Sequence, residues 1–251
     1  MIMYNIERGY YMSQNNPVYR RVLLKVSGEA LSGGKGTGLD FAVMKEVCLA
    51  IKKCTDMGVQ VGIVVGGGNF WRGVKNGEGK MDRTRADRMG MMATVMNAIY
   101  VADAFRQNGI KAFVQTPIMI GTMTEMFSKE SAIAHLEKGE VVIFAAGMGH
   151  PFFSTDTITA LRGAELDVDG LFFAKSIDGV YDDDPATNPN AKKIDVIKAE
   201  DIVKNNLKVI DMAAANLCFE RKIPVIIFGL NEENSIVRAV GGEKIGTIVT
   251  V

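Results

Sequence analysis

Two glycine-rich loops carry the residues best suited to chemistry in this sequence. The first is Gly66-Gly67-Gly68, which directly follows a run of Val and Ile, and Arg72 stands four residues after its last glycine. Glycines allow positive φ and let a ligand approach the backbone with no Cβ in the way. An arginine adds a fixed positive charge that suits a phosphate. A turn that serves only to leave a sheet is the alternative, and three glycines followed by Arg72 favour a phosphate-binding loop over it.

The second loop, residues 147–156, follows another strongly apolar run at 140–146. Ser154 or Thr155 can cap a helix that begins at Asp156, and the free N–H groups of a helix N-terminus form a natural phosphate site. Turn chemistry alone does not easily explain two such loops, each at the end of an apolar run. The second loop therefore strengthens the interpretation of the first.

Lys25 lies in an otherwise apolar run, residues 21–27, just before Gly28. A lysine in such a run is usually a solvated edge residue. This one stands at the carboxyl end of the expected strand, where open α/β sheets bind ligands. Together with Arg72, Asp156 and the two loops, it suits phosphoryl transfer, in which positioning and charge stabilisation do most of the catalysis.

Other chemistries lack their signatures. No Gly-x-Gly-x-x-Gly opens a helix after the first strand, no Gly-x-Ser-x-Gly elbow is present, and the glycine-rich segment 33–38 is not a Walker A loop. By itself that segment indicates a flexible connection that is too rich in glycine for a helix.

The sequence also lacks a cluster of residues for metal-dependent hydrolysis, because His135 and His150 stand apart from one another. Residues 182–184 are three aspartates that suit a metal, although a solvated turn is the commoner role of such a run.

The composition is that of a globular protein able to bury a large core, with 47% apolar and 23% charged residues among 251. Twenty-nine basic residues balance 29 acidic ones, which argues against a general nucleic-acid or anionic-membrane binder. No apolar run approaches the ~18 residues of a membrane span. The three cysteines show no metal spacing, so we expect reduced thiols and a cytoplasmic protein.

Predicted strands and helices alternate along the chain, which implies an α/β fold with a mainly parallel sheet and helices on both faces. The expected strands are residues 21–27, 59–65, 111–115, 140–146, 170–174, 224–228 and 247–251. The expected helices are residues 41–57, 83–107, 125–138, 156–166, 209–221 and 235–240. We expect one domain over residues 17–251, preceded by a disordered tail at 1–16 in which Met12 is an alternative start.

Apolar residues at 3-4-3 spacing predict the buried faces of the first two long helices. In the first, the predicted stripe consists of Phe41, Met44, Cys48 and Ile51. In the second, it consists of Met89, Met92, Met96 and Ile99, which we interpret as core filler rather than a cofactor site.

Taken together and in order, the motifs resemble those of bacterial UMP kinases, a branch of the amino acid kinase superfamily. The resemblance covers residues 17–251 and rests on Lys25-Val26-Ser27-Gly28-Glu29-Ala30, Val65 to Asn69, Arg72-Gly73, Asp87 before Met89-Gly90-Met91, residues 147–156, and Asp178-Gly179-Val180-Tyr181 with Asp184-Pro185. It implies a three-layer α/β/α sandwich with a mainly parallel central sheet. It also implies transfer of the γ-phosphoryl group of ATP to UMP to give UDP, in pyrimidine nucleotide (CTP/UTP) biosynthesis. Mg²⁺ would be carried by ATP rather than held in a metal site of the protein.

Position by position, the resemblance makes Lys25 and Asp156 catalytic. The implied ATP-binding residues are Lys25, Val26, Ser27, Gly28, Gly68, Arg72, Lys175, Tyr181 and Asp184. The implied UMP-binding residues are Gly67, Asp87, Met148, Gly149, His150, Pro151, Phe152, Phe153, Ser154 and Thr155. The segment that matches the family's GTP-responsive region consists of Gly33, Gly34, Lys35, Gly36, Thr37 and Gly38. A homohexamer activated by GTP and inhibited by UTP is implied as well.

This sequence departs from the family pattern at two places. His150 stands where the family often has Asn, and Lys175-Ser176 stands where Thr or Asn commonly contacts adenine. Two alternatives remain open on the sequence: another superfamily kinase, acting on an acyl acid or a carbamate, and a non-catalytic nucleotide sensor. Asp87 together with residues 147–156 speaks against the first, and Lys25 with Asp156 speaks against the second.

Overall fold

The computed structural model describes residues 17–72, 77, 79–204 and 210–250. The tail expected at residues 1–16 lies outside this part, as do Val251 at the end of the last expected strand and Val209 at the start of one expected helix. All statements below refer to the described residues.

The centre of the fold is a sheet of nine strands in the order β4-β3-β5-β2-β1-β6-β10-β11-β9. The strands are β1 Arg21–Val26, β2 Gln60–Val65, β3 Ala112–Thr116, β4 Glu125–Met126, β5 Val141–Phe144, β6 Gly170–Lys175, β9 Val196–Lys198, β10 Val225–Gly229 and β11 Thr247–Thr250. Every pair is parallel except β10 with β11. The predicted alternation of strands and helices thus produces the mainly parallel sheet that it implied.

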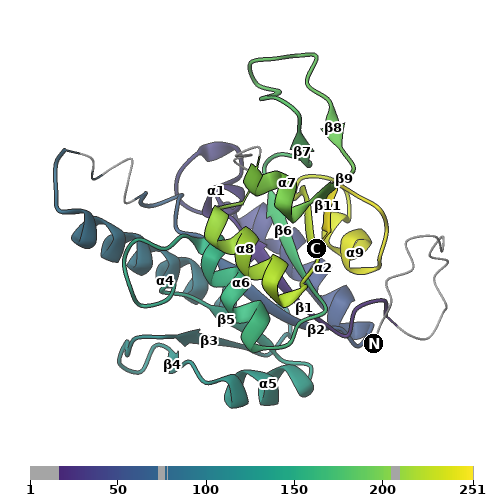
Figure 1. The fold of residues 1–251 in the computed structure, drawn as a ribbon. Helices are drawn as coiled ribbons and strands as arrows, with labels where there is room; N and C mark the ends of the chain where they lie inside the picture. The colour runs from purple at the N-terminus through teal and green to yellow at the C-terminus, as the bar shows by residue number, and fades with distance from the viewer. Residues whose placement is uncertain (1–16, 73–76, 78, 205–209, 251) are drawn as a thin grey trace.

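Helices cover both faces of this sheet (Figure 1). They are α1 Gly28–Leu31, α2 Phe41–Asp56, α4 Arg83–Gln107, α5 Lys129–Glu137, α6 Thr155–Glu165, α7 Ala199–Lys204, α8 Met212–Arg221 and α9 Ser235–Val240. One apolar core contains residues of α2, α4 and α9, and the other contains residues of α5, α6, α7 and α8. The predicted three-layer α/β/α sandwich is confirmed.

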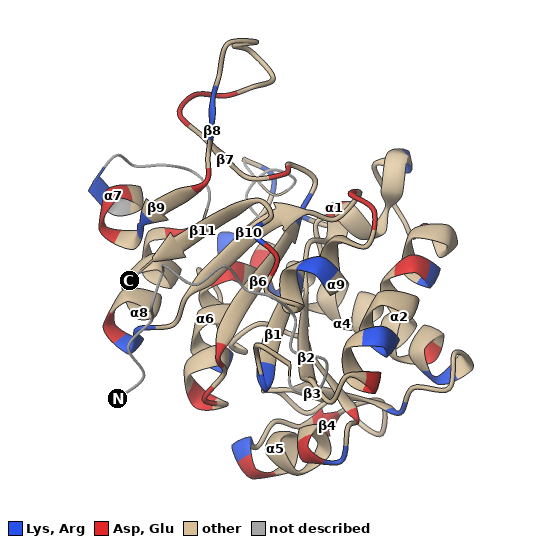
Figure 2. Ribbon diagram, turned by 90° about the vertical axis from the view of Figure 1, so that its right-hand side faces the viewer, with Lys and Arg blue, Asp and Glu red and all other residues tan. Residues whose placement is uncertain are grey.

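Side-chain alternation along β1 divides its residues between the two cores. Val22, Leu24 and Val26 belong to the core on the α2 side, and Leu23 belongs to the core on the α6 side. Because successive strand residues point to opposite faces, Lys25 points to the side of Leu23 and α6. In Figure 2 the strands are mostly neutral, and charged residues lie mainly on helices and loops. A lysine buried in β1 is therefore an exception.

The methionine stripe predicted for the core side of α4 is wrong. Met89, Met92 and Met96 are 43%, 40% and 53% exposed, and Ile99 is 39% exposed. The buried face consists of Ala86, Met91, Ala93, Thr94, Val95, Asn97, Ala98, Val101, Ala102 and Phe105. This helix carries two apolar stripes of similar period, and the one rich in small residues packs on the sheet.

Other features of the predicted elements also differ from the structure. Phe41 is 70% exposed, so the buried stripe of α2 begins at Met44 and includes Val47 and Cys54. Residues 125–126 form the short edge strand β4, and the next helix starts only at Lys129, with Ser128 as its N-cap.

Two expected loops contain regular structure. Residues 33–35 form a 3₁₀ turn, although the segment is rich in glycine. The acidic loop at 182–184 belongs to a hairpin, β7 Val180–Tyr181 with β8 Lys193–Ile194, that extends away from the body (Figure 1).

Candidate active site

A cavity of about 650 Å³ opens beside the carboxyl ends of β1, β2 and β5. The predicted site residues that line it are Lys25, Ser27, Gly28, Gly67, Gly68, Arg72, Asp87, His150, Phe152, Phe153, Ser154 and Thr155. Parallel strands explain this gathering, because their carboxyl ends meet at one edge of the sheet. Among the predicted residues, Val26, Met148, Gly149, Pro151, Asp156, Lys175, Tyr181, Asp184 and the segment 33–38 are not part of this lining.

Two backbone segments approach each other closely at the floor of the cavity. The Gly66 N–H donates to the Val26 carbonyl at 2.9 Å. A Cβ built at Gly28 would lie 2.5 Å from Asn69 Oδ1 and 2.7 Å from the Gly68 nitrogen. Gly28 therefore has to be glycine so that its backbone can pack closely against the first glycine loop, in addition to any ligand contact.

Two buried asparagines hold this loop in place. The side chain of Asn97, in α4, donates to the Gly66 carbonyl at 2.6 Å and to Asn69 Oδ1 at 2.8 Å. The Asn69 amide donates to the Gly38 carbonyl at 2.7 Å. Sequence reasoning missed both residues as parts of the site. The signal for Asn97 was an amide in the middle of a long helix, where an asparagine is unfavourable unless its hydrogen bonds are used.

Lys25 and Asp156 form an ion pair, with Nζ and Oδ1 3.0 Å apart and side chains 11% and 15% exposed. Asp156 is held in the first turn of α6, whose N-cap is Ser154: the Ser154 hydroxyl accepts from the N–H groups of Asp156 and Thr157. The structure thus joins the end of β1 to the start of α6, as the positions of the two residues in the sequence predicted.

Lys175 joins this pair from the end of β6. Its Nζ lies 3.8 Å from Asp156 Oδ2, so one carboxylate stands between two lysines. Burial lowers the pKa of Lys175, as does the nearby charge of Lys25, while the Asp156 carboxylate opposes both effects. Lys175 thus lies beside the Lys25–Asp156 pair, at a position where the family pattern commonly has an adenine contact.

Asp211 is a third residue that sequence reasoning missed as part of the site. It caps α8 by accepting from the Ala214 N–H at 2.8 Å. Its other oxygen accepts from the hydroxyls of Ser154 and Thr157, the latter at 2.9 Å. One carboxylate therefore ties the start of α8 to the start of α6, and the signal was an aspartate at a predicted helix start.

Asp87 lies on the cavity wall in the first turns of α4. Its carboxylate is 2.9 Å from Arg83 Nε and accepts from the Phe152 N–H at 2.9 Å. The Arg83 guanidinium in turn stacks over the Phe152 ring at 5.5 Å. Asp87 thus connects α4 to the second loop, although 65 residues separate it from Phe152.

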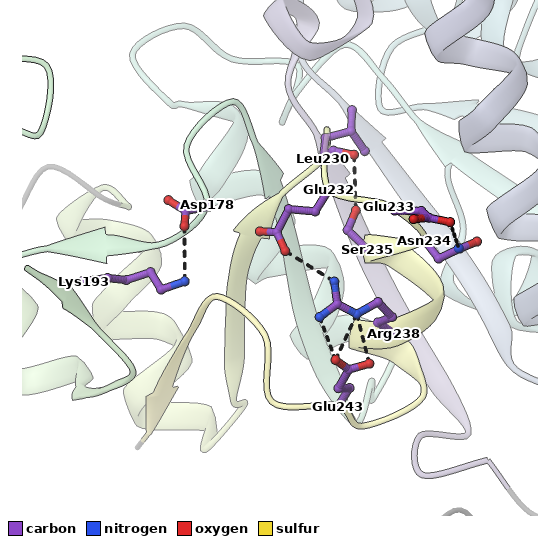
Figure 3. Close-up of polar contacts among 9 residues, drawn as sticks. All are labelled: Asp178, Lys193, Leu230, Glu232, Glu233, Asn234, Ser235, Arg238 and Glu243. Carbon is purple, nitrogen blue, oxygen red and sulfur yellow. Dashed lines mark hydrogen bonds and ion pairs between the residues drawn. The ribbon is translucent and has the colours of Figure 1, made fainter.

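The residues implied at the adenosine end lie on the projecting hairpin. The Tyr181 hydroxyl donates to Asp178 Oδ1 at 2.8 Å, which raises the pKa of Tyr181. Lys193 Nζ lies 3.2 Å from the same carboxylate (Figure 3). The Asp184 side chain accepts from the Ala186 N–H within the exposed turn. These contacts shape the hairpin and leave it outside the main cavity.

The loop after β10 lies beside the hairpin and is fixed by Arg238. The guanidinium contacts Glu232 at 3.4 Å and Glu243 at 2.6 Å (Figure 3). His135, the other isolated histidine, is not part of the cavity lining: it is 2.7 Å from Glu140 and stacks on Phe113 with ring centroids 3.8 Å apart. It is a structural residue. In the described part of the chain, no three His, Cys, Asp or Glu side chains are placed to hold a metal ion.

The model of the amino acid kinase family matches residues 20–229 of this sequence. The chain belongs to the amino acid kinase family. Among solved structures, it is similar to the UMP kinase of Bacillus anthracis, with a TM-score of 0.88 and 32% identity over 92% of this chain and 96% of the other. It is similar to the UMP kinase of Ureaplasma parvum, with a TM-score of 0.86 and 35% identity over 92% and 99% of the two chains. For the uridylate kinase of Archaeoglobus fulgidus the TM-score is 0.71, with 26% identity over 91% and 99%.

No helix in the part of this amino acid kinase that the structure describes is both long and apolar enough to cross a membrane.

Proposed function

We propose that this amino acid kinase transfers the γ-phosphoryl group of ATP to UMP, giving UDP. The main observation in support of the proposal is the Lys25–Asp156 ion pair, which lies where the two glycine loops meet. Asp87 lies on the wall of the same cavity. The similarity to two UMP kinases over 92% of the chain supports the same acceptor. Phosphoryl transfer needs cations at the oxygens that gain charge, and Lys25 is the central candidate.

On this proposal, the donor and acceptor occupy opposite sides of Lys25. ATP phosphates contact the backbone from Lys25 to Gly28, with Gly68 and Arg72 on their other side. Arg72 forms an ion pair with Glu29 across this end of the cavity. Tyr181 and Asp184 serve the adenosine end if the hairpin approaches a bound nucleotide.

UMP lies against Gly67 and the second loop, from Met148 to Thr155. The Asp87 carboxylate accepts hydrogen bonds from the ribose hydroxyls, in place of or beside the Phe152 N–H that it binds here. His150 is exposed at the cavity rim, where it can contact the nucleotide.

We propose that Mg²⁺ enters with ATP. Two carboxylates near the start of α6 are already engaged, Asp156 by two lysines and Asp211 by Ser154, Thr157 and Ala214. Because these carboxylates already have partners, we propose that phosphate oxygens and water coordinate the ion, which is the usual coordination of Mg²⁺ in phosphotransferases. When bound, the ion neutralises charge on the phosphates.

The regulatory part of the proposal is activation by GTP through segment 33–38. This segment is bonded to the site: the Thr37 hydroxyl donates to the Asn69 carbonyl at 2.9 Å, and the Gly38 N–H donates to the same oxygen at 3.2 Å. Gly33, Gly36 and Gly38 have positive φ, so the conformation depends on glycine. A change in the conformation of segment 33–38 would be transmitted through these hydrogen bonds to the loop that contains Gly67 and Gly68. UTP, which carries the base and ribose of UMP, is the proposed inhibitor.

We further propose a homohexamer in the cytoplasm, serving pyrimidine nucleotide synthesis. The exposed stripe of Met89, Met92, Met96 and Ile99 on α4 supports self-association, because copies of the chain can cover this apolar face. The three cysteines are buried free thiols, which suits a reducing compartment.

Release of ADP, measured with UMP, CMP, AMP, acetylglutamate and carbamate as acceptors, tests the proposal. We expect UMP to be used and CMP to be poor, because a site that hydrogen-bonds one base edge leaves buried groups unpaired with the other, a mismatch worth up to ~10⁴ in kcat/KM. Comparable kcat/KM for UMP and CMP would contradict the proposed specificity. Activity on acetylglutamate or carbamate alone would establish the alternative superfamily function.

A further inference from the structure

The backbone of the second glycine loop is strained at two residues that are not glycine. Ala146, which immediately precedes the loop, has a φ of 58°, and Phe152 within it has a φ of 73°. Residues with a Cβ adopt this left-handed region only at a cost, so surrounding contacts have to hold them there. Two of the five such residues in the described part of the chain stand at this one loop.

Side chains of α4 bind the backbone N–H groups of both strained residues. The Ala146 N–H donates to Thr94 Oγ1 at 2.8 Å in a buried contact, and the Phe152 N–H donates to Asp87 at 2.9 Å. Thr94 follows Asp87 by seven residues, about two helical turns, so both side chains lie on the same face of α4. The helix thus holds the second loop at two points.

The same face of α4 supports the first glycine loop. Asn97, three residues after Thr94, donates to the Gly66 carbonyl at 2.6 Å. A Cβ built at Gly67 would lie 2.9 Å from the Gly90 carbonyl oxygen and 3.0 Å from the Thr94 nitrogen, so this loop packs directly on the helix. One helix face therefore sets the position of both glycine loops relative to each other.

The Thr94 hydroxyl makes two hydrogen bonds in this arrangement. It donates to the Met91 carbonyl at 2.7 Å, and its oxygen accepts from the Ala146 N–H. Thr94 is 8% exposed and Ala146 is 0% exposed. Water therefore has little access to the Ala146 N–H, and removal of the hydroxyl would leave a buried donor without an acceptor.

We propose that Thr94 is a positioning residue for the acceptor nucleotide, because its hydroxyl fixes the left-handed turn at Ala146 from which the second loop begins. This inference rests on the proposed function, in which that loop binds UMP. Thr94 acts through the backbone of the loop and contributes no group to the phosphoryl transfer itself. Loss of its hydroxyl should weaken UMP and leave the ATP contacts at residues 25–28 intact.

The Thr94→Val variant tests the proposal, since it removes the hydroxyl and keeps the branched shape of the side chain. In hydrogen–deuterium exchange of the nucleotide-free protein, we expect peptides that contain Ala146 to exchange faster and peptides of β1 to exchange as before. KM for UMP should rise by about 5- to 100-fold, the loss expected when a buried donor loses its acceptor. Both kcat and KM for ATP should change little, as for an interaction that acts on binding of the acceptor alone.

Three further variants make the result interpretable. Thr94→Ser keeps the hydroxyl, so it should restore both the slow exchange and the low KM for UMP. Thr94→Ala also removes the hydroxyl and replaces the valine variant if that variant does not fold. Thr55→Val is the matched control: the Thr55 hydroxyl likewise donates to a carbonyl three residues earlier in its helix, that of Lys52 at 3.0 Å, and Thr55 is not part of the cavity lining. It should change neither the exchange at Ala146 nor the kinetics.

Other outcomes overturn the inference. A raised KM for UMP with unchanged exchange at Ala146 would make Thr94 a direct contact of the ligand. Faster exchange with an unchanged KM for UMP would make the hydrogen bond purely structural, and equal increases in KM for UMP and ATP would show a general loosening of the site. If the unchanged protein binds UMP in calorimetry but does not phosphorylate it, the proposed function fails, whereas exchange and UMP affinity in the variants still decide the role of Thr94.

Discussion

Removal of either member of the Lys25–Asp156 pair should abolish most of the turnover, and removal of both should cost little more. Their charged atoms are 3.0 Å apart and both side chains are largely buried. At that distance, an effective dielectric constant near 20 gives an attraction of roughly 5–6 kcal/mol, much of which offsets the desolvation of the two charges. The net effect is to fix the direction of the ammonium group rather than to add a large stability.

The expected rates follow from this geometry. Lys25→Ala should lower kcat by about 10²–10³, the usual effect of losing one preorganised charge-stabilising donor. Asp156→Asn should lower kcat with little change in KM for UMP, because its carboxylate holds two lysines and is not part of the cavity lining. The double variant should be scarcely worse than Lys25→Ala, since groups that act as a unit are strongly non-additive.

Single-turnover transfer from γ-labelled ATP to UMP, measured in the unchanged protein, both single variants and the double variant, tests this expectation. Thermal unfolding of all four forms shows whether each is folded. Fully additive losses would refute the shared role. A Lys25→Ala enzyme with near-normal turnover would show that the catalytic centre lies elsewhere.

Three other outcomes are expected. Asp87→Asn should weaken UMP binding by roughly 1–3 kcal/mol, the worth of a charged hydrogen bond, with KM for ATP unchanged. Weaker binding of ATP alone would place Asp87 at the ATP site instead of the UMP site. Deletion of Gly34, Lys35 and Gly36 should abolish the response to GTP and keep most of the basal activity, and an unchanged GTP response in steady-state assays would make the segment a mere connector. The hydrogen bond from His135 lowers the pKa of Glu140 below its ordinary value of 4.5, so the stability it provides is present above that pH and is lost as pH falls through the lower folded-state pKa. Glu140→Gln should therefore flatten the acid side of the stability curve in urea unfolding at several pH values, and an unchanged acid slope would contradict this assignment.

Local patterns were sufficient for most elements of the fold. The 25-residue helix α4 and the six-residue helix α9 have the bounds that the sequence predicted, residues 83–107 and 235–240. Periodicity did not decide which of two apolar stripes on α4 faces the sheet, because both have the same period. The contrast between the buried Ala98 and the exposed Met96 arises from the close packing of a long helix on strands, where small residues fit.

For the candidate site, sequence patterns were enough to predict which residues share the sheet edge. A strand-terminal Lys25, two glycine loops and a helix start at Asp156 are features of neighbouring residues, and parallel topology gathers them. Two contacts could be found only in the folded chain: Lys175 with Asp156, and Asp211, which connects α8 to Ser154. These partners lie 19 and 57 residues apart in the sequence, and their meeting depends on strand order and register, which no local pattern encodes.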